Sequence, residues 1–189
     1  MLLLKLVLGN TKLLVNEVFT TSLVVALISG AKALTNVVLG ATNIELVRPW
    51  TYLITTVYSE LKLVTSLWSI PMWLLVIIST YLMSNYVIQD LKTTFSTLKY
   101  LGSSVNYLIK LIITRYLITS SLICITGVSV GVVVAQVVFR VIAYIIKTPY
   151  EVPNLYLSDL IEVVVITYIT IFLGMLKPLV KLVRCGYVP

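Results

Sequence analysis

The sequence predicts an all-α, polytopic integral membrane protein with four transmembrane helices and two interfacial amphipathic helices. Of its 189 residues, 59% are hydrophobic and only 11% are charged, and the mean hydropathy is +1.05. Soluble domains carry about 25% charged residues, so a water-soluble chain of this composition could not cover its surface. In lipid, only helices and closed barrels satisfy the backbone hydrogen bonds. Barrel strands alternate apolar and polar residues over about 10 positions, whereas the apolar runs here are longer and mostly unalternated, which favours helices.

Four stretches are long enough to cross a bilayer, which takes about 20 helical residues. We expect the spans at about residues 13–38, 67–89, 111–139 and 160–182. The first contains Glu17 and Lys32, which fall near its two ends, where charged heads can reach the lipid head groups. We expect all four to form a single transmembrane domain that covers residues 1–189.

Two further segments have the spacing of amphipathic helices. In residues 49–65, apolar side chains recur at steps of three and four after Pro49, which suits the first turn of a helix. We expect this segment to lie in the outer interface with Trp50 and Tyr58 as anchors. The second segment, residues 90–109, links spans two and three and carries one apolar face.

The distribution of basic residues predicts that both termini are cytoplasmic. The net charge is +7, from 14 Lys and Arg against 7 Asp and Glu. Cytoplasmic segments of membrane proteins carry an excess of Lys and Arg. With the N-terminus inside, the inner segments hold more bases than the outer ones; the inner bases are Lys5, Lys12, Lys92, Lys99, Lys110, Arg115, Lys177, Lys181 and Arg184. Since the bases flank apolar spans, we expect a partner in membrane lipid and none in nucleic acid.

The chain lacks the residue patterns of an enzyme. It contains no histidine, which removes the commonest general base and His-ligated metals. No glycine run has the spacing of a P-loop, and no pair of carboxylates clusters within a span. We expect Glu162 at the outer head groups beside Asp159, and Glu17 at the inner surface, paired with Lys12 or with a base of a partner. No cofactor or metal is expected.

Small residues recur every three or four positions in two of the spans. Such spacing lets helices approach closely in lipid. The residues concerned are Ala26, Gly30 and Ala33 in the first span and Gly127, Gly131 and Ala135 in the third. Packing within one subunit and dimerisation both explain the pattern.

The segment from residue 90 to residue 139 resembles the FtsX/MacB-type permease family. Leu98, Leu101, Gly102 and Ser103 match the "lkalGa" core of that family's cytoplasmic helix, and the apolar run with Gly127 and Gly131 is similar to the glycine-spaced helix that follows it. The stretch LVVALISGAKALTN resembles the family's first helix. The chain departs from the family in two respects: Thr93 to Ser96 stand where an acidic residue is common, and the outer domain between the first two spans is reduced to about 30 residues.

The resemblance implies a permease subunit of an ABC-type complex in the plasma membrane, not itself an enzyme. Such permeases form dimers, as homodimers or with a related permease, and rest on cytoplasmic ATPase subunits. The residues that would contact the ATPase are Lys92, Leu98, Lys99, Leu101, Gly102, Ser103 and Ser104. Closure of the ATPases would then drive export or mechanical signalling. The alternative is a non-catalytic structural subunit of a larger membrane complex, such as a respiratory or secretion assembly.

Overall fold

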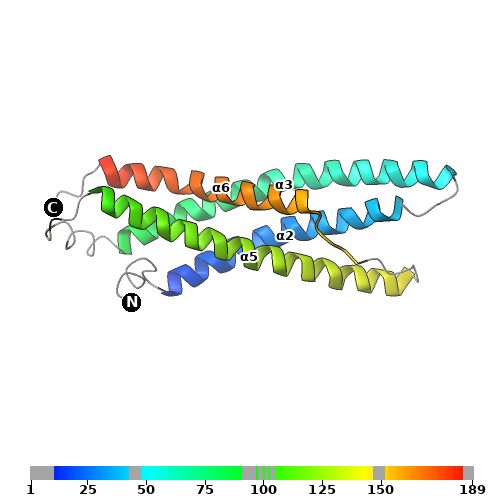
Figure 1. Cartoon of the computed structure of the whole chain (residues 1–189), viewed down its shortest axis with the longest axis horizontal. Helices are drawn as coiled ribbons and strands as arrows, with labels where there is room; N and C mark the ends of the chain where they lie inside the picture. Colours follow the sequence, from blue (N-terminus) through cyan, green and yellow to red (C-terminus); the bar gives the residue numbers. More distant parts are fainter. Residues whose placement is uncertain are drawn as a thin grey trace.

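The computed structural model consists of four long helices that run side by side (Figure 1). The structure describes residues 11–42, 48–90, 105–146 and 152–184, and residues 97, 100 and 102 between them. The helices are α2 (Thr11–Thr42), α3 (Arg48–Asp90), α5 (Val105–Ile146) and α6 (Leu157–Arg184). We call the end of the bundle where α2 begins and α6 finishes the terminal end, and the opposite end the distal end.

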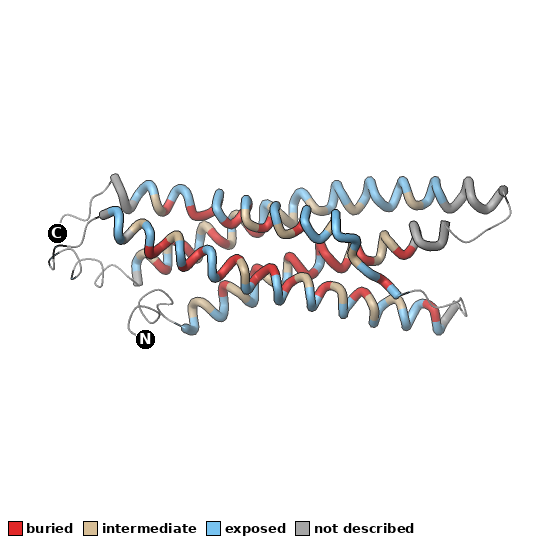
Figure 2. Tube along the Cα trace, viewed as in Figure 1, coloured by how far each residue is buried: buried red, intermediate tan, exposed pale blue. Residues whose placement is uncertain are grey.

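Helix α2 lies at the centre of the arrangement. It packs along both α5 and α3, α3 packs along α6, and α5 and α6 contact over a shorter stretch. Buried residues therefore follow the inward faces of the helices, as Figure 2 shows. The core contains β-branched residues such as Val25, Val76 and Val163, each 0% exposed.

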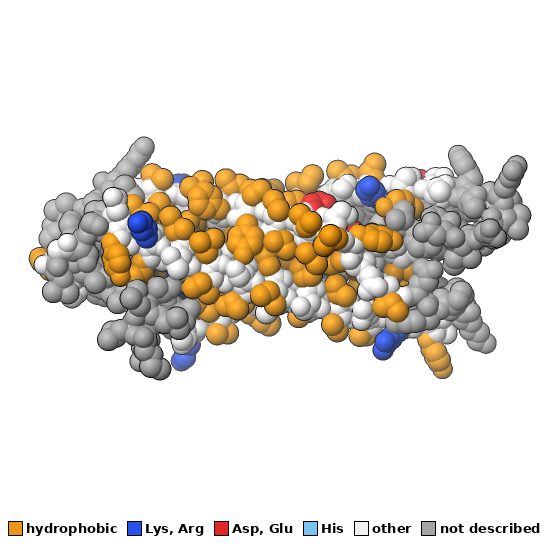
Figure 3. Space-filling view, viewed as in Figure 1, with side chains coloured by type: hydrophobic (Ala, Val, Ile, Leu, Met, Phe, Trp, Pro, Cys, Tyr) orange, Lys and Arg blue, Asp and Glu red, His pale blue; other side chains and the backbone are white. Residues whose placement is uncertain are grey.

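All four helices are long and apolar enough to cross a membrane, which confirms the four predicted spans. The apolar parts are Thr11–Val37, Thr55–Gln89, Ile109–Tyr144 and Leu157–Lys181. Large apolar side chains face outwards, for example Phe19 at 66% and Ile125 at 65% exposure, and they cover the middle of the molecule in Figure 3, while lysines and arginines appear towards its ends. A surface of this kind suits a solvent of lipid.

Several threonines of the spans are turned inwards. Thr21, Thr80, Thr119 and Thr167 are each no more than 1% exposed. The hydroxyls of Thr119 and Thr167 donate to the carbonyl oxygens one turn earlier, at 2.9 and 2.6 Å. These bonds satisfy the hydroxyls without water, as the interior of a membrane protein requires.

The structure does not confirm the two interfacial helices. Residues 49–65 belong to α3, which continues without a break from Arg48 to Asp90 and contains Pro71. No glycine or proline separates this segment from the span, and its residues from Thr55 to Val64 are mostly exposed, so the helix continues beyond the neighbouring α6. At 1.5 Å per residue, α3 is about 65 Å long, twice the hydrocarbon thickness. The second predicted segment, residues 90–109, lies mostly outside the described residues.

Candidate functional site

Glycines bring α2 and α5 into backbone contact midway along the bundle. A Cβ atom on Gly131 would lie 2.5 Å from the carbonyl oxygen of Ala26, and one on Gly30 would lie 3.0 Å from the carbonyl oxygen of Gly131. The Ser29 hydroxyl, on α2, donates to the Gly127 carbonyl of α5 at 3.4 Å. The structure thus brings four of the six predicted packing residues together within one chain.

The remaining two packing residues, Ala33 and Ala135, are both fully buried. A further glycine that the sequence pattern did not single out, Gly174, makes a similar approach between α6 and α3. A Cβ atom there would lie 2.8 Å from the carbonyl oxygen of Ile77. A lone glycine has no repeat to mark it, so only the helix pairing reveals its role.

A buried ion pair joins α2 to α5 near the terminal end. The carboxylate of Glu17 lies 3.9 Å from the guanidinium of Arg115, and both side chains are 1% exposed. The expectation that Glu17 lies at the head groups was therefore wrong, because α2 turns this side chain towards α5. Next to the pair, the Tyr116 hydroxyl donates to Ser84 of α3 at 2.6 Å. Three helices thus meet in one polar layer.

The sequence contained a signal for this ion pair. An acid and a base stand inside apolar spans, at similar depths from the same end of the bundle. Isolated charges are costly in a bilayer and tend to pair with each other. The positions of Glu17 and Arg115 in the sequence alone therefore favour this ion pair.

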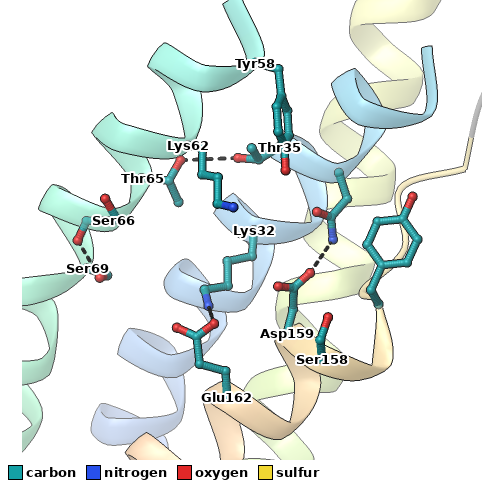
Figure 4. A pocket seen from close by; sticks show the side chains of 12 residues that line it. Lys32, Thr35, Tyr58, Lys62, Thr65, Ser66, Ser69, Ser158, Asp159 and Glu162 are labelled. Carbon is teal, nitrogen blue, oxygen red and sulfur yellow. Dashed lines mark hydrogen bonds and ion pairs between the residues drawn. The ribbon is translucent and has the colours of Figure 1, made fainter. Parts of the chain in front are cut away.

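A polar pocket of about 320 Å³ opens between α2, α3 and the start of α6, towards the distal end (Figure 4). In it, the Lys32 amine lies 2.6 Å from the Glu162 carboxylate. The side-chain amide of Asn36 donates to Asp159 at 2.8 Å and to the Asn154 carbonyl at 3.2 Å. These contacts tie the start of α6 to α2.

The α3 wall of the pocket carries hydroxyls and a second lysine. Thr65 of α3 is 3.2 Å from Thr35 of α2, oxygen to oxygen, and Lys62 extends from α3 into the same space (Figure 4). The remaining polar and aromatic lining consists of Tyr58, Ser66, Ser69, Tyr156 and Ser158. The pocket could not be predicted from the sequence. Its lining residues come from α2, α3 and the start of α6, and the sequence does not show which helices are neighbours.

The depth of the pocket follows from the positions of charged residues along the helices. Lys12 and Lys32 are about 30 Å apart along α2 at 1.5 Å per residue, and Glu162 and Lys181 are separated by nearly the same rise along α6. This distance equals the hydrocarbon thickness of a bilayer. We infer that these charged residues of α2 and α6 bracket one bilayer, which would place the pocket at the head-group level on the distal side.

The predicted ATPase-contacting segment falls largely outside the described residues. This applies to Lys92, Leu98, Lys99, Leu101, Ser103 and Ser104. Gly102 is described: it is exposed, lies in a turn and has a φ of 85°. Side chains with a Cβ rarely adopt this conformation, so the chain bends at a residue suited to it, just before α5 begins.

The part of the chain that the structure describes forms no cluster that could hold a metal ion. No group of three His, Cys, Asp or Glu side chains is placed there to hold a metal ion. Cys124 is a buried free thiol.

Four apolar helices with polar groups buried between them and charges at their ends define a multi-pass membrane protein. A comparison with known families gives its class. Residues 66–185 match the family model described as FtsX-like permease C-terminal. Because the match covers more than half of the chain, the protein belongs to the FtsX-like permease family, as the sequence resemblance predicted. The match spans α5, all of α6 and α3 from Ser66 onwards, and it leaves α2 outside. A search of curated proteins finds no match.

Proposed function

We propose that this protein is the membrane-spanning subunit of an ABC-type complex, driven by a separate cytoplasmic ATPase and working as a dimer in the plasma membrane. The family match over residues 66–185 carries the proposal. In this arrangement, both termini and the segment of residues 90–109 face the cytoplasm, as the distribution of basic residues favours. The subunit itself hydrolyses no ATP.

The position of residues 90–109 supports a role in coupling. The segment lies between the end of α3 at Asp90 and the start of α5 at Val105, so a push on it acts on two spans at once. The turn at Gly102 precedes α5 directly. Leu98 and Leu101 supply apolar contacts to an ATPase, and Lys92 and Lys99 supply charge.

The proposed coupling is tested by measuring ATP hydrolysis in complexes purified gently from native membranes. We expect an ATPase to accompany the chain, and we expect Leu98→Asp to abolish the stimulation of its activity. Leu157→Asp is the matched control, because Leu157 is 74% exposed at the start of α6, on the distal side. An unchanged ATPase rate in Leu98→Asp, or a larger membrane assembly without any ATPase, contradicts the proposal.

The proposed orientation has its own test, in a chain whose Cys124 and Cys185 are replaced by alanine. We expect a cysteine at position 103 to react with a membrane-impermeant maleimide only in inside-out vesicles. A cysteine at Leu157 is the control and reacts only in right-side-out vesicles. Labelling of position 103 from the exterior excludes contact with a cytoplasmic ATPase.

A further inference from the structure

The pocket between α2, α3 and the start of α6 has the features of a ligand site at the membrane surface. We propose that it binds a zwitterionic head group that carries both a phosphate and an amine, as phosphatidylethanolamine does. The inference goes beyond the proposed function and does not depend on an ATPase. It rests on the charges, hydroxyls and depth of the pocket.

The charges of the pocket leave one cation and one anion for a ligand. Lys32 is paired with Glu162 at 2.6 Å, so these two largely neutralise each other. Asp159 accepts a hydrogen bond from the amide of Asn36 at 2.8 Å, and this neutral partner does not offset a carboxylate charge. Lys62 supplies the remaining positive charge on the opposite wall, on α3 (Figure 4).

A ligand with separated charges of both signs satisfies this arrangement. Its phosphate would lie against Lys62 and the hydroxyls of α3, and its amine would lie against Asp159. A simple anion would meet the carboxylates of Asp159 and Glu162, and a simple cation would meet Lys62. Like charges of this kind are the usual means by which a site rejects a wrong ligand.

The remaining lining suits both parts of such a head group. The hydroxyls of Thr65, Ser66 and Ser69 line the α3 wall, where each donates to a carbonyl oxygen of its own helix. Such a hydroxyl donates to a phosphate oxygen once it rotates away from that carbonyl. The rings of Tyr58 and Tyr156 line the same space, and aromatic rings attract an ammonium group. A volume of about 320 Å³ falls within the range of small-molecule sites.

Lipid is the expected source because the pocket lies at the head-group level. Towards the middle of the bilayer, apolar side chains of α3 and α6 are exposed: Leu67 and Ile70 at 58%, Ile161 at 52% and Val165 at 48%. Acyl chains of a bound lipid would run along these side chains. The head group would then be held by the pocket while its tails stay in lipid.

The test measures binding of short-chain lipids to the full chain in detergent by native mass spectrometry. The probes are dihexanoyl phosphatidylethanolamine and dihexanoyl phosphatidylglycerol. We expect the zwitterionic lipid to bind at least about tenfold more tightly, the effect of one charge-assisted hydrogen bond. We expect Asp159→Asn to remove this preference, because Asp159 faces the amine, and Lys62→Gln to weaken the binding of both lipids, because Lys62 faces the phosphate that they share. Equal binding of both lipids overturns the proposal.

Lys110→Gln serves as the control, because Lys110 is an exposed lysine near the terminal end and its loss should leave the preference unchanged. A preference that survives Asp159→Asn, or binding of both lipids that is unchanged in Lys62→Gln, also overturns the proposal. Soluble phosphoethanolamine distinguishes the sources of the head group. If phosphoethanolamine competes with the lipid, the pocket recognises the head group alone. If the lipid binds and phosphoethanolamine does not compete, the ligand is a lipid of the bilayer.

A second measurement uses the unaltered protein. In phosphatidylethanolamine nanodiscs, compared with phosphatidylglycerol nanodiscs, we expect slower acetylation of the Lys62 amine and an unchanged rate at Lys110. Equal acetylation of Lys62 in the two lipids contradicts the proposal without any substitution in the chain.

Discussion

Adding a single methyl group to Gly131 should destabilise the bundle, because this glycine is where α2 and α5 approach most closely. A Cβ atom on Gly131 would meet the hydroxyl of Ser29, the carbonyl oxygen of Ala26 at 2.5 Å and the amide nitrogen of Gly30 at 3.0 Å. The hydroxyl can rotate away. The carbonyl and the amide belong to the backbone of α2 and move only with the helix.

The expected cost follows from this geometry. Relieving a 2.5 Å contact with backbone separates the two helices by roughly 1 Å, which forfeits a quarter to a half of the dispersion attraction of each contact. Overpacking costs about 1–3 kcal/mol, and a backbone clash belongs at the upper end. Alanine regains up to about 1 kcal/mol of helix propensity. The net loss for Gly131→Ala is therefore about 2 kcal/mol, or roughly 30-fold in the unfolding equilibrium.

The assay is reversible unfolding of the purified chain in mixed micelles with increasing SDS. Gly30→Ala is an internal comparison. A Cβ atom on Gly30 would lie 3.0 Å from the Gly131 carbonyl oxygen, so this substitution should lower the free energy of unfolding by much less than Gly131→Ala does. Val133→Ile adds one carbon at a lipid-facing position, 57% exposed, and should change little. Equal stability of Gly131→Ala and the unaltered protein would refute the close approach of α2 and α5.

Three further substitutions test the polar contacts in the same unfolding assay. Arg115→Gln leaves the Glu17 carboxylate buried without its counter-charge and should lower the free energy of unfolding by about 3 kcal/mol or more. Replacing both residues by Gln should lower it by less than the sum of the two single substitutions. Simple additivity of the two effects would contradict the ion pair. Lys32→Glu should lower the free energy of unfolding by up to about 1 kcal/mol, since Glu162 is half-exposed. Adding Glu162→Lys should restore this stability. A double variant that is no more stable than the single one contradicts the contact. Tyr116→Phe should lose about 1 kcal/mol with its hydrogen bond to α3, and an unchanged midpoint would exclude that bond.

The four spans could be predicted from the sequence because hydropathy and length alone decide them. The predicted ends agree well for the first and last spans: 13–38 against Thr11–Val37, and 160–182 against Leu157–Lys181. The helix that contains the second span is longer than predicted, because residues 49–65 continue it, whereas their mixed polar residues indicated a separate helix. Local amphipathicity does not tell whether a helix lies in the interface or continues out of it.

The polar contacts depend on which helices are neighbours, and the sequence does not encode this openly. The pocket needs Asn36 and Asp159, which are far apart in the chain and meet only because α6 packs near α2 and α3. Glu17 was assigned to the surface for the same reason, because its partner Arg115 lies on another helix. The roles of Leu98 and Leu101 remain predictions.

Helix α2 is tied to its neighbours at two levels of the bundle. Near the terminal end, Glu17 faces Arg115, ten residues after the start of α5. About 22 Å further along α2, at 1.5 Å per residue, Lys32 faces Glu162 at the pocket. Between these points, Gly131 holds α5 against α2 by backbone contact.

A displacement at the start of α5 would therefore reach the pocket through α2 as a rigid element. This gives the two proposals a common test, because spatial proximity alone does not demonstrate coupling. If an ATPase acts on residues 90–109, its nucleotide state should alter the affinity of the pocket for the zwitterionic lipid. Replacing both Glu17 and Arg115 by Gln should weaken that dependence while Lys62 and Asp159 still bind the head group. An unchanged dependence would place the coupling elsewhere, in the contact of α3 with α6.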